Sequence, residues 1–148
     1  MKNKITDKTL TELQPGVISD TGFMSSDKRN TEKIIADDAV IVTKLGVTNK
    51  SIAKRMRELA RIGEKGLGQT VRHGDLEISV DSSRGKIPCP FMNDEFLPKN
   101  NTTVKNLKTG KEITYSDLNI HMIEKHGFYE GKGSVYRIDP ATLWQIIG

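Results

Sequence analysis

The chain has 148 residues, of which 35% are hydrophobic and 28% charged, and its formal net charge is +4. Its length suits one domain with a real core, and no apolar run reaches the roughly 18 residues that a membrane span needs. The single cysteine excludes an internal disulfide. These features predict a cytoplasmic protein with no membrane partner, with delivery as a secreted effector kept as an alternative.

The first 31 residues are polar and lack a sustained hydrophobic period. They predict a flexible amino-terminal arm with a short helix near residues 8–14. From residue 32 to residue 148, the alternation of helical and strand patterns predicts a single α+β domain. We expect it to contain two β-hairpins and three to four helices.

Pro88 and Pro90 are expected to divide this domain, because proline suits neither a central strand nor a helix interior. The first subdomain, residues 32–86, is predicted to be two helices followed by a hairpin. The second, residues 87–148, is predicted to be a hairpin, a helix, a strand and a last helix.

The two helices of the first subdomain are expected over residues 31–45 and 49–62. The second has the clearer signal, because Thr48 can cap its amino terminus and its apolar residues recur with a helical period. A hairpin over residues 67–81 follows. Its turn is expected at Gly74-Asp75, where glycine comes first.

The second subdomain is expected to open with a hairpin over residues 102–115. A helix over residues 117–126 follows, which Ser116 caps and Gly127 ends. A strand over residues 135–138 then leads to a short helix, opened by an aspartate and a proline.

Positive charge is concentrated between Lys44 and Arg72, where eight basic residues stand against Glu58 and Glu64. That segment therefore has a net charge of +6, and the rest of the chain has −2. Charge gathered on one element indicates a polyanionic partner better than evenly spread charge does.

The segment Leu45–Leu59 resembles the central stretch of helix-turn-helix proteins, which reads leucine-glycine-valine-serine/threonine and then serine/threonine-isoleucine/valine. Gly46 allows the positive φ needed to leave the first helix, Val47 packs the turn, and Thr48 caps the second helix. With the following hairpin as a wing, the resemblance to winged-helix proteins covers residues 42–81. It implies binding of duplex DNA by the second helix in the major groove.

The nucleic-acid-binding residues that this resemblance implies are Thr48, Asn49, Lys50, Lys54, Arg55, Arg57, Arg61 and Arg72. The chain departs from the family pattern at Val42, where alanine is usual, and it has two helices rather than three before the hairpin. The same residues also suit an ordinary amphipathic helix with a solvated basic face.

Residues 87–142 are similar, in the order of their elements, to U-box modules, which recruit ubiquitin-conjugating enzymes without zinc and occur in some bacterial effectors. The similarity rests on Ile87, Cys89-Pro90, the helix near residues 118–126 and Pro140, although Pro88 separates the isoleucine from the Cys-Pro pair. It implies a protein-interaction module as the alternative function. The implied contacts are Ile87, Phe91 and Pro140.

Metal and catalytic sites have little support in the sequence. His121 and His126 are five positions apart, about 140° around a helix axis, so they are expected to lie on the surface rather than to share a metal. Cys89 lies between prolines and is expected to be a packed or idle thiol rather than a nucleophile. No catalytic residue, cofactor or metal site is predicted, and an enzyme remains the third class of function.

The glycine-rich segment over residues 127–134 matches neither a P-loop nor a dinucleotide fingerprint. It is expected to be a loop whose glycines permit tight turns. Lys132, Tyr136 and Arg137 are the anion-binding candidates around it.

Overall fold

The computed structural model describes residues 29–148 with the exception of residues 135 and 136. The arm and the helix near residues 8–14 expected from the sequence lie outside this range. The elements in chain order are α2 Thr31–Lys44, α3 Asn49–Glu64, β1 Val71–His73, β2 Leu76–Cys89, β3 Met92–Asn106, β4 Glu112–Ser116, α4 Asp117–His126 and α5 Pro140–Ile147. No helix among the described residues is long and apolar enough to cross a membrane.

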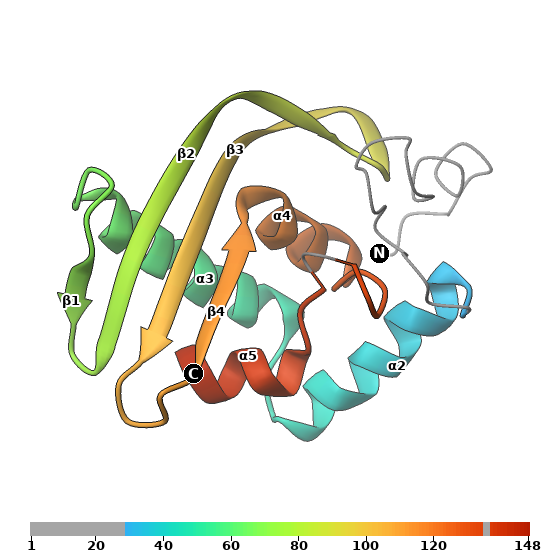
Figure 1. Ribbon diagram of the computed structural model, residues 1–148. Coiled ribbons are helices and arrows are strands. Elements are labelled where there is room, and N and C mark those ends of the chain that lie inside the picture. The colour runs from blue at the N-terminus through green and yellow to red at the C-terminus, as the bar shows by residue number, and fades with distance from the viewer. Residues whose placement is uncertain (1–28, 135–136) are drawn as a thin grey trace.

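The four strands form one antiparallel sheet in the order β1-β2-β3-β4, which confirms the α+β class. The predicted hairpins are the first and last pairs of this sheet, with Leu76 opposite His73 and Val104 opposite Ile113. The long β2–β3 pair joins them and arches over α4 (Figure 1).

β2 continues across the boundary expected after residue 86, so both halves of the chain share one sheet. Pro88 is tolerated in it because β1 pairs with β2 only as far as Ile78, which leaves the far end of β2 with β3 as its one strand partner. Cys89 pairs with Met92, so Pro90 lies in the turn of a hairpin that joins β2 to β3.

The expected strand over residues 135–138 differs from the structure. Residues 135 and 136 are outside the described range, and Arg137 and Ile138 belong to no strand. The backbone N–H of Ile138 donates to the carbonyl oxygen of Tyr129 at 3.1 Å, which ties the segment to the preceding loop instead.

Local capping fixes the ends of the helices, as the sequence predicted. The Thr48 and Ser116 hydroxyls accept from the third backbone N–H of α3 and α4, and the side chains of Ser51 and Asn119 accept from the capping residues in return. Gly127 ends α4 in the left-handed region at a φ of 63°.

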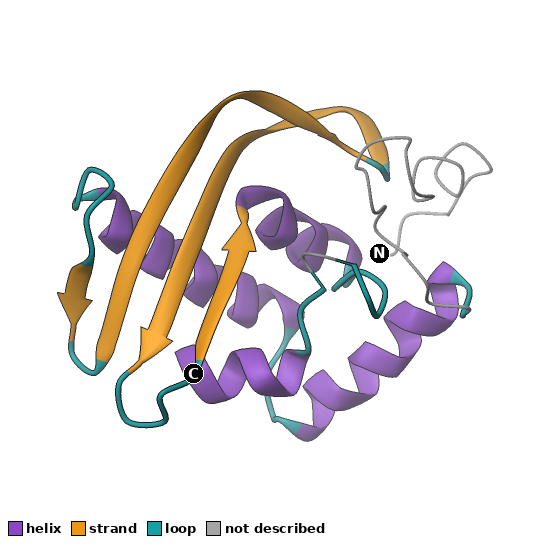
Figure 2. Ribbon diagram, in the orientation of Figure 1, coloured by secondary structure: helices purple, strands orange, loops and turns teal. Residues whose placement is uncertain are grey.

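Helices α3 and α4 cover one face of the sheet, while α2 lies beside α5 at the end of the molecule (Figure 2). The apolar stripe of α3 packs on the strands together with Ile78, Val104 and Tyr115. Gly63 lets α3 pack tightly on β2, because an added Cβ would be 2.7 Å from the Ile78 side chain. A second apolar cluster lies under the tip of the β2–β3 hairpin and includes Cys89, Met122 and Phe128.

Candidate nucleic-acid interface

Four basic side chains form a ridge along the exposed side of α3 and its C-cap residue. They are Lys50, Lys54, Arg61 and Lys65, and all four are exposed. At about 100° per residue they fall within an arc of roughly 60°, and they extend over about 22 Å of helix. We call these four residues the basic ridge.

The basic ridge is exposed because the opposite side of α3 packs in the core. Ile52, Met56 and Leu59 have no exposed surface and pack on the sheet. Within residues 29–148, apart from 135 and 136, no ion pair joins a ridge residue to a carboxylate. The exposed side chains of Glu58 and Glu64 flank the ridge on either edge and lower its net charge.

Three residues expected to contact DNA are instead engaged within the fold. Asn49 Oδ1 accepts from the Tyr129 hydroxyl at 2.7 Å, and Arg55 Nε donates to the carbonyl oxygen of Ile147 at 2.8 Å. The Arg57 guanidinium donates to both carboxylate oxygens of Glu124. These side chains face α4, α5 and the loop after α4, so they are not on the basic ridge.

The other expected contacts have different surroundings. Thr48 is exposed and its hydroxyl is used as the cap of α3. Arg72 is exposed on β1, and its Nε donates to the carbonyl oxygen of Gly74 at 3.1 Å across the hairpin turn. Lys65 was not among the expected contacts, although its spacing of four residues from Arg61 was available in the sequence.

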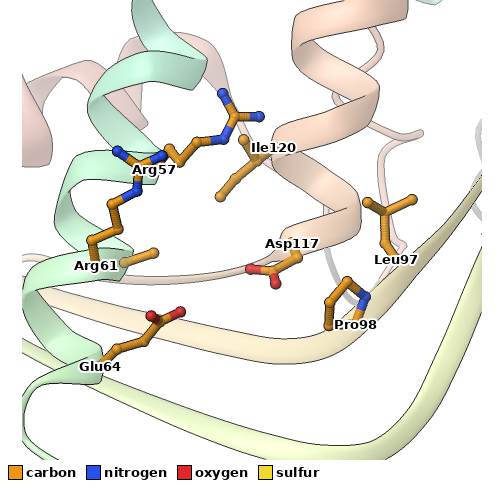
Figure 3. A pocket seen from close by; sticks show the side chains of 8 residues that line it. Arg57, Arg61, Glu64, Leu97, Pro98, Asp117 and Ile120 are labelled. Carbon is orange, nitrogen blue, oxygen red and sulfur yellow. The ribbon is translucent and has the colours of Figure 1, made fainter.

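A groove of about 260 Å³ lies beside the basic ridge, between α3, β3 and the start of α4 (Figure 3). Arg57 and Arg61 form one wall, and Leu97 and Pro98 of the arching hairpin form another. Its other lining residues are Ala60, Glu64, Asp117 and Ile120.

Two carboxylates make this groove a poor phosphate site. Burial raises the pKa of Asp117, a hydrogen bond from Asn100 lowers it in part, and the negative charge of Glu64 raises it further. A phosphate inside the groove would face both acidic groups, so the favourable position for a polyanion is along the ridge outside it.

The residues implied by the U-box similarity pack against or within the protein interior. Ile87 and Phe91 are partly buried and pack against the second apolar cluster, and Pro140 is buried at the start of α5. The structure therefore offers none of these three side chains as a freely exposed docking contact.

The loop after α4 is held by a buried polar network. Glu130 is buried and accepts from Asn119 Nδ2 at 2.8 Å and from the Ser134 hydroxyl at 2.7 Å. Arg137 forms an ion pair with Asp38 of α2 and also donates to the carbonyl oxygen of Glu130. Arg137, an anion-binding candidate from the sequence, thus has its guanidinium engaged by partners within the fold. Lys132, another candidate, is exposed.

The expectation that His121 and His126 lie on the surface is wrong, because both are 8% exposed. His126 is at the last position of α4, where the ring of Phe91, in the turn of the β2–β3 hairpin, stacks on it. Cys89, whose burial was expected, is the hairpin residue beside it, with Sγ 3.7 Å from His126 Nε2.

No protein-family model, curated protein or solved structure matches this chain.

Proposed function

We propose that this protein binds nucleic acid, with duplex DNA as the partner, through the basic ridge of α3. The observation that carries the proposal is the arrangement of four exposed cations within roughly 60° of one helix face. Free cations on one straight element can neutralise successive phosphates and release their counterions, which supplies most of the affinity in non-specific binding.

The ridge favours contact with the phosphate backbone over reading of bases. Asn49 and Arg57, two side chains suited to bidentate base contacts, are held by partners within the fold, which leaves Arg61 as the one arginine of the ridge. Lysines supply most of the ridge, and a lysine ammonium acts on phosphate as a point charge with little sequence information. We therefore infer weak discrimination between DNA sequences.

The expected affinity follows from the number of charges. Four phosphate contacts give a slope of about −3.6 for log affinity against log salt, so affinity falls roughly 100-fold between about 50 and 200 mM salt. Non-specific affinities of this kind are on the order of 10⁻⁴ to 10⁻⁶ M at physiological salt.

A charge-reversal experiment separates the ridge from the general basic character of the chain. Binding of a labelled random-sequence duplex to the full chain is followed by fluorescence anisotropy at low salt. The ridge variant is Lys54→Glu with Arg61→Glu, and the matched control is Lys105→Glu with Lys111→Glu. The control residues are also exposed but lie on β3 and in the turn before β4.

We expect binding to disappear in the ridge variant and to persist, somewhat weakened, in the control, with unchanged circular dichroism in both. Equal losses in the two variants would mean that net charge alone drives binding. Unchanged binding in the ridge variant would reject α3 as the interface.

A further inference from the structure

Three side chains with metal-binding atoms meet at the tip of the β2–β3 hairpin. They are Cys89, His121 and His126, all of them buried, and one ligand atom from each lies within 4.8 Å of the others. The thiol comes from the last residue of β2, and both imidazoles come from α4. Elements 32 or more positions apart in the sequence thus bring a soft sulfur and two nitrogens together.

The spacing of these atoms is close to that of a tetrahedral zinc site. With bonds of about 2.3 Å to sulfur and 2.0–2.1 Å to nitrogen, tetrahedral angles place sulfur and nitrogen about 3.5 Å apart. The observed distance from Cys89 Sγ to His126 Nε2 is 3.7 Å. The remaining separations are no longer than 4.8 Å, so rotamer adjustment on the order of 1 Å brings the set into coordination range.

The surroundings hold the ligands in this arrangement. The Phe91 ring stacks on the His126 ring with centroids 4.4 Å apart, and the His121 and His126 rings meet edge to face at 5.7 Å. Zinc binds the thiolate and the neutral imidazole, and all three of these side chains are buried, so water does not compete freely for their ligand atoms.

We propose that Cys89, His121 and His126 bind a zinc ion that fixes the turn of the β2–β3 hairpin to the carboxyl end of α4. Thiolate with imidazole is the donor set that suits zinc among the abundant divalent ions. On binding, the sulfur of Cys89 forms a bond to zinc and its proton passes to solvent. The three protein ligands leave a fourth position for a water molecule or another small ligand.

The ion has a structural task in this proposal. The hairpin tip packs on α4 through the small apolar cluster that contains Cys89, Met122 and Phe128. One zinc ion would add a cross-link between β2 and α4 beside this cluster, which is separate from the main core. Because all three ligands are buried, the ion enters as the chain folds.

Cobalt substitution tests the proposal without any variant. The full chain is refolded with cobalt(II), and its absorption spectrum is recorded before and after addition of zinc. We expect one cobalt per chain, a thiolate-to-cobalt charge-transfer band, visible bands of tetrahedral intensity, and loss of all of them when zinc is added. Since Cys89 is the single cysteine, the charge-transfer band reports on this residue alone.

Variants assign the two imidazoles. Cys89→Ser, His121→Asn and His126→Asn are each expected to lose the stoichiometric cobalt spectrum, whereas His73→Asn is expected to keep it. His73 is the remaining histidine of the chain and is exposed on β1. Folded native protein that binds no cobalt after refolding, or a spectrum without the thiolate band, would overturn the proposal. A full spectrum in His121→Asn and His126→Asn would overturn it as well.

Discussion

Arg57 on α3 donates to both carboxylate oxygens of Glu124 on α4, at 2.9 and 3.5 Å. The two residues are 67 positions apart in the sequence, and their side chains are 39% and 22% exposed. Arg57, the most central arginine of α3, is therefore not a free cation, because its ion pair joins α3 to α4.

Glu124→Gln should lower the free energy of unfolding by up to about 1 kcal/mol at neutral pH, the usual value for a partly exposed pair. The hydrogen bond from Arg57 holds the pKa of Glu124 below its ordinary value of 4.5. The stabilisation is therefore present above that value and is lost as the pH falls through the folded-state pKa. Urea unfolding of both proteins at neutral and acid pH checks this, and a difference that grows on acidification would contradict it.

Asp38→Asn should be far more damaging, with a loss of about 3–5 kcal/mol, because it removes the buried countercharge of Arg137 and leaves only the exposed carboxylate of Asp139, 4.0 Å away. Asp38 is 2% exposed and Arg137 12% exposed, and Arg137 Nη2 donates to Asp38 Oδ1 at 2.9 Å. Asp37→Asn is the matched control, since this neighbour pairs with Arg29 and Lys33 at the surface and should matter little. Equal unfolding midpoints for the two variants in urea would refute the assignment.

Glu130→Gln should make stability less dependent on pH. Burial raises the pKa of Glu130 to about 7, more than its hydrogen bonds from Ser134 and Asn119 lower it. The folded state therefore binds a proton that the unfolded state has already released, and stability falls as the pH rises from 4.5 to about 7.

Glutamine keeps the shape of Glu130 but cannot ionise; its amide oxygen can still accept from Asn119, and its amide nitrogen can donate to the Ser134 hydroxyl. The variant should thus be more stable than the native protein above pH 7, by about 3 kcal/mol at most, and similar to it near pH 4.5. Unfolding curves at about pH 5 and about pH 8 measure this. Parallel pH profiles of the two proteins would show that Glu130 ionises normally.

Lys54 and Arg55 are adjacent in the sequence but should behave in opposite ways. Arg55→Ala removes the hydrogen bond to the carbonyl oxygen of Ile147 and should cost about 1.5–3 kcal/mol of stability with little effect on DNA affinity. Lys54→Ala should weaken DNA binding several-fold and leave stability unchanged. Anisotropy and thermal unfolding of the two variants provide the comparison, and an equal loss of affinity in both would contradict the division of roles.

Local signals in the sequence predicted the elements well. Thr48, Ser116 and the Asp139-Pro140 pair each begin a helix, and Gly127 ends one, because caps depend on residues within one turn. The Gly74-Asp75 turn was predictable for the same reason. The boundary predicted at Pro88 was wrong. A strand tolerates proline where no second strand pairs with that side of it, and this depends on the arrangement of the whole sheet.

The roles of individual side chains were harder to predict, since they depend on partners distant in the sequence. The basic character of α3 is visible in the sequence, but the split between free and engaged cations requires Glu124 and the carbonyl of Ile147 to be in place. The spacing of His121 and His126 on a helix gave no reason to expect their imidazoles to lie close together. The third member of that cluster, Cys89, comes from a hairpin 32 residues earlier.

The salt dependence of DNA binding tests the central claim most directly. Affinity for a random duplex is measured across a salt series for the native chain, for Lys54→Ala with Arg61→Ala, and for Lys105→Ala with Lys111→Ala. The basic ridge predicts a slope near −3.6 for the native chain, a slope about 1.8 shallower for the first variant, and little change for the second. Absence of binding at low salt, or a slope that the first variant does not alter, would contradict the assignment of α3 as a nucleic-acid interface.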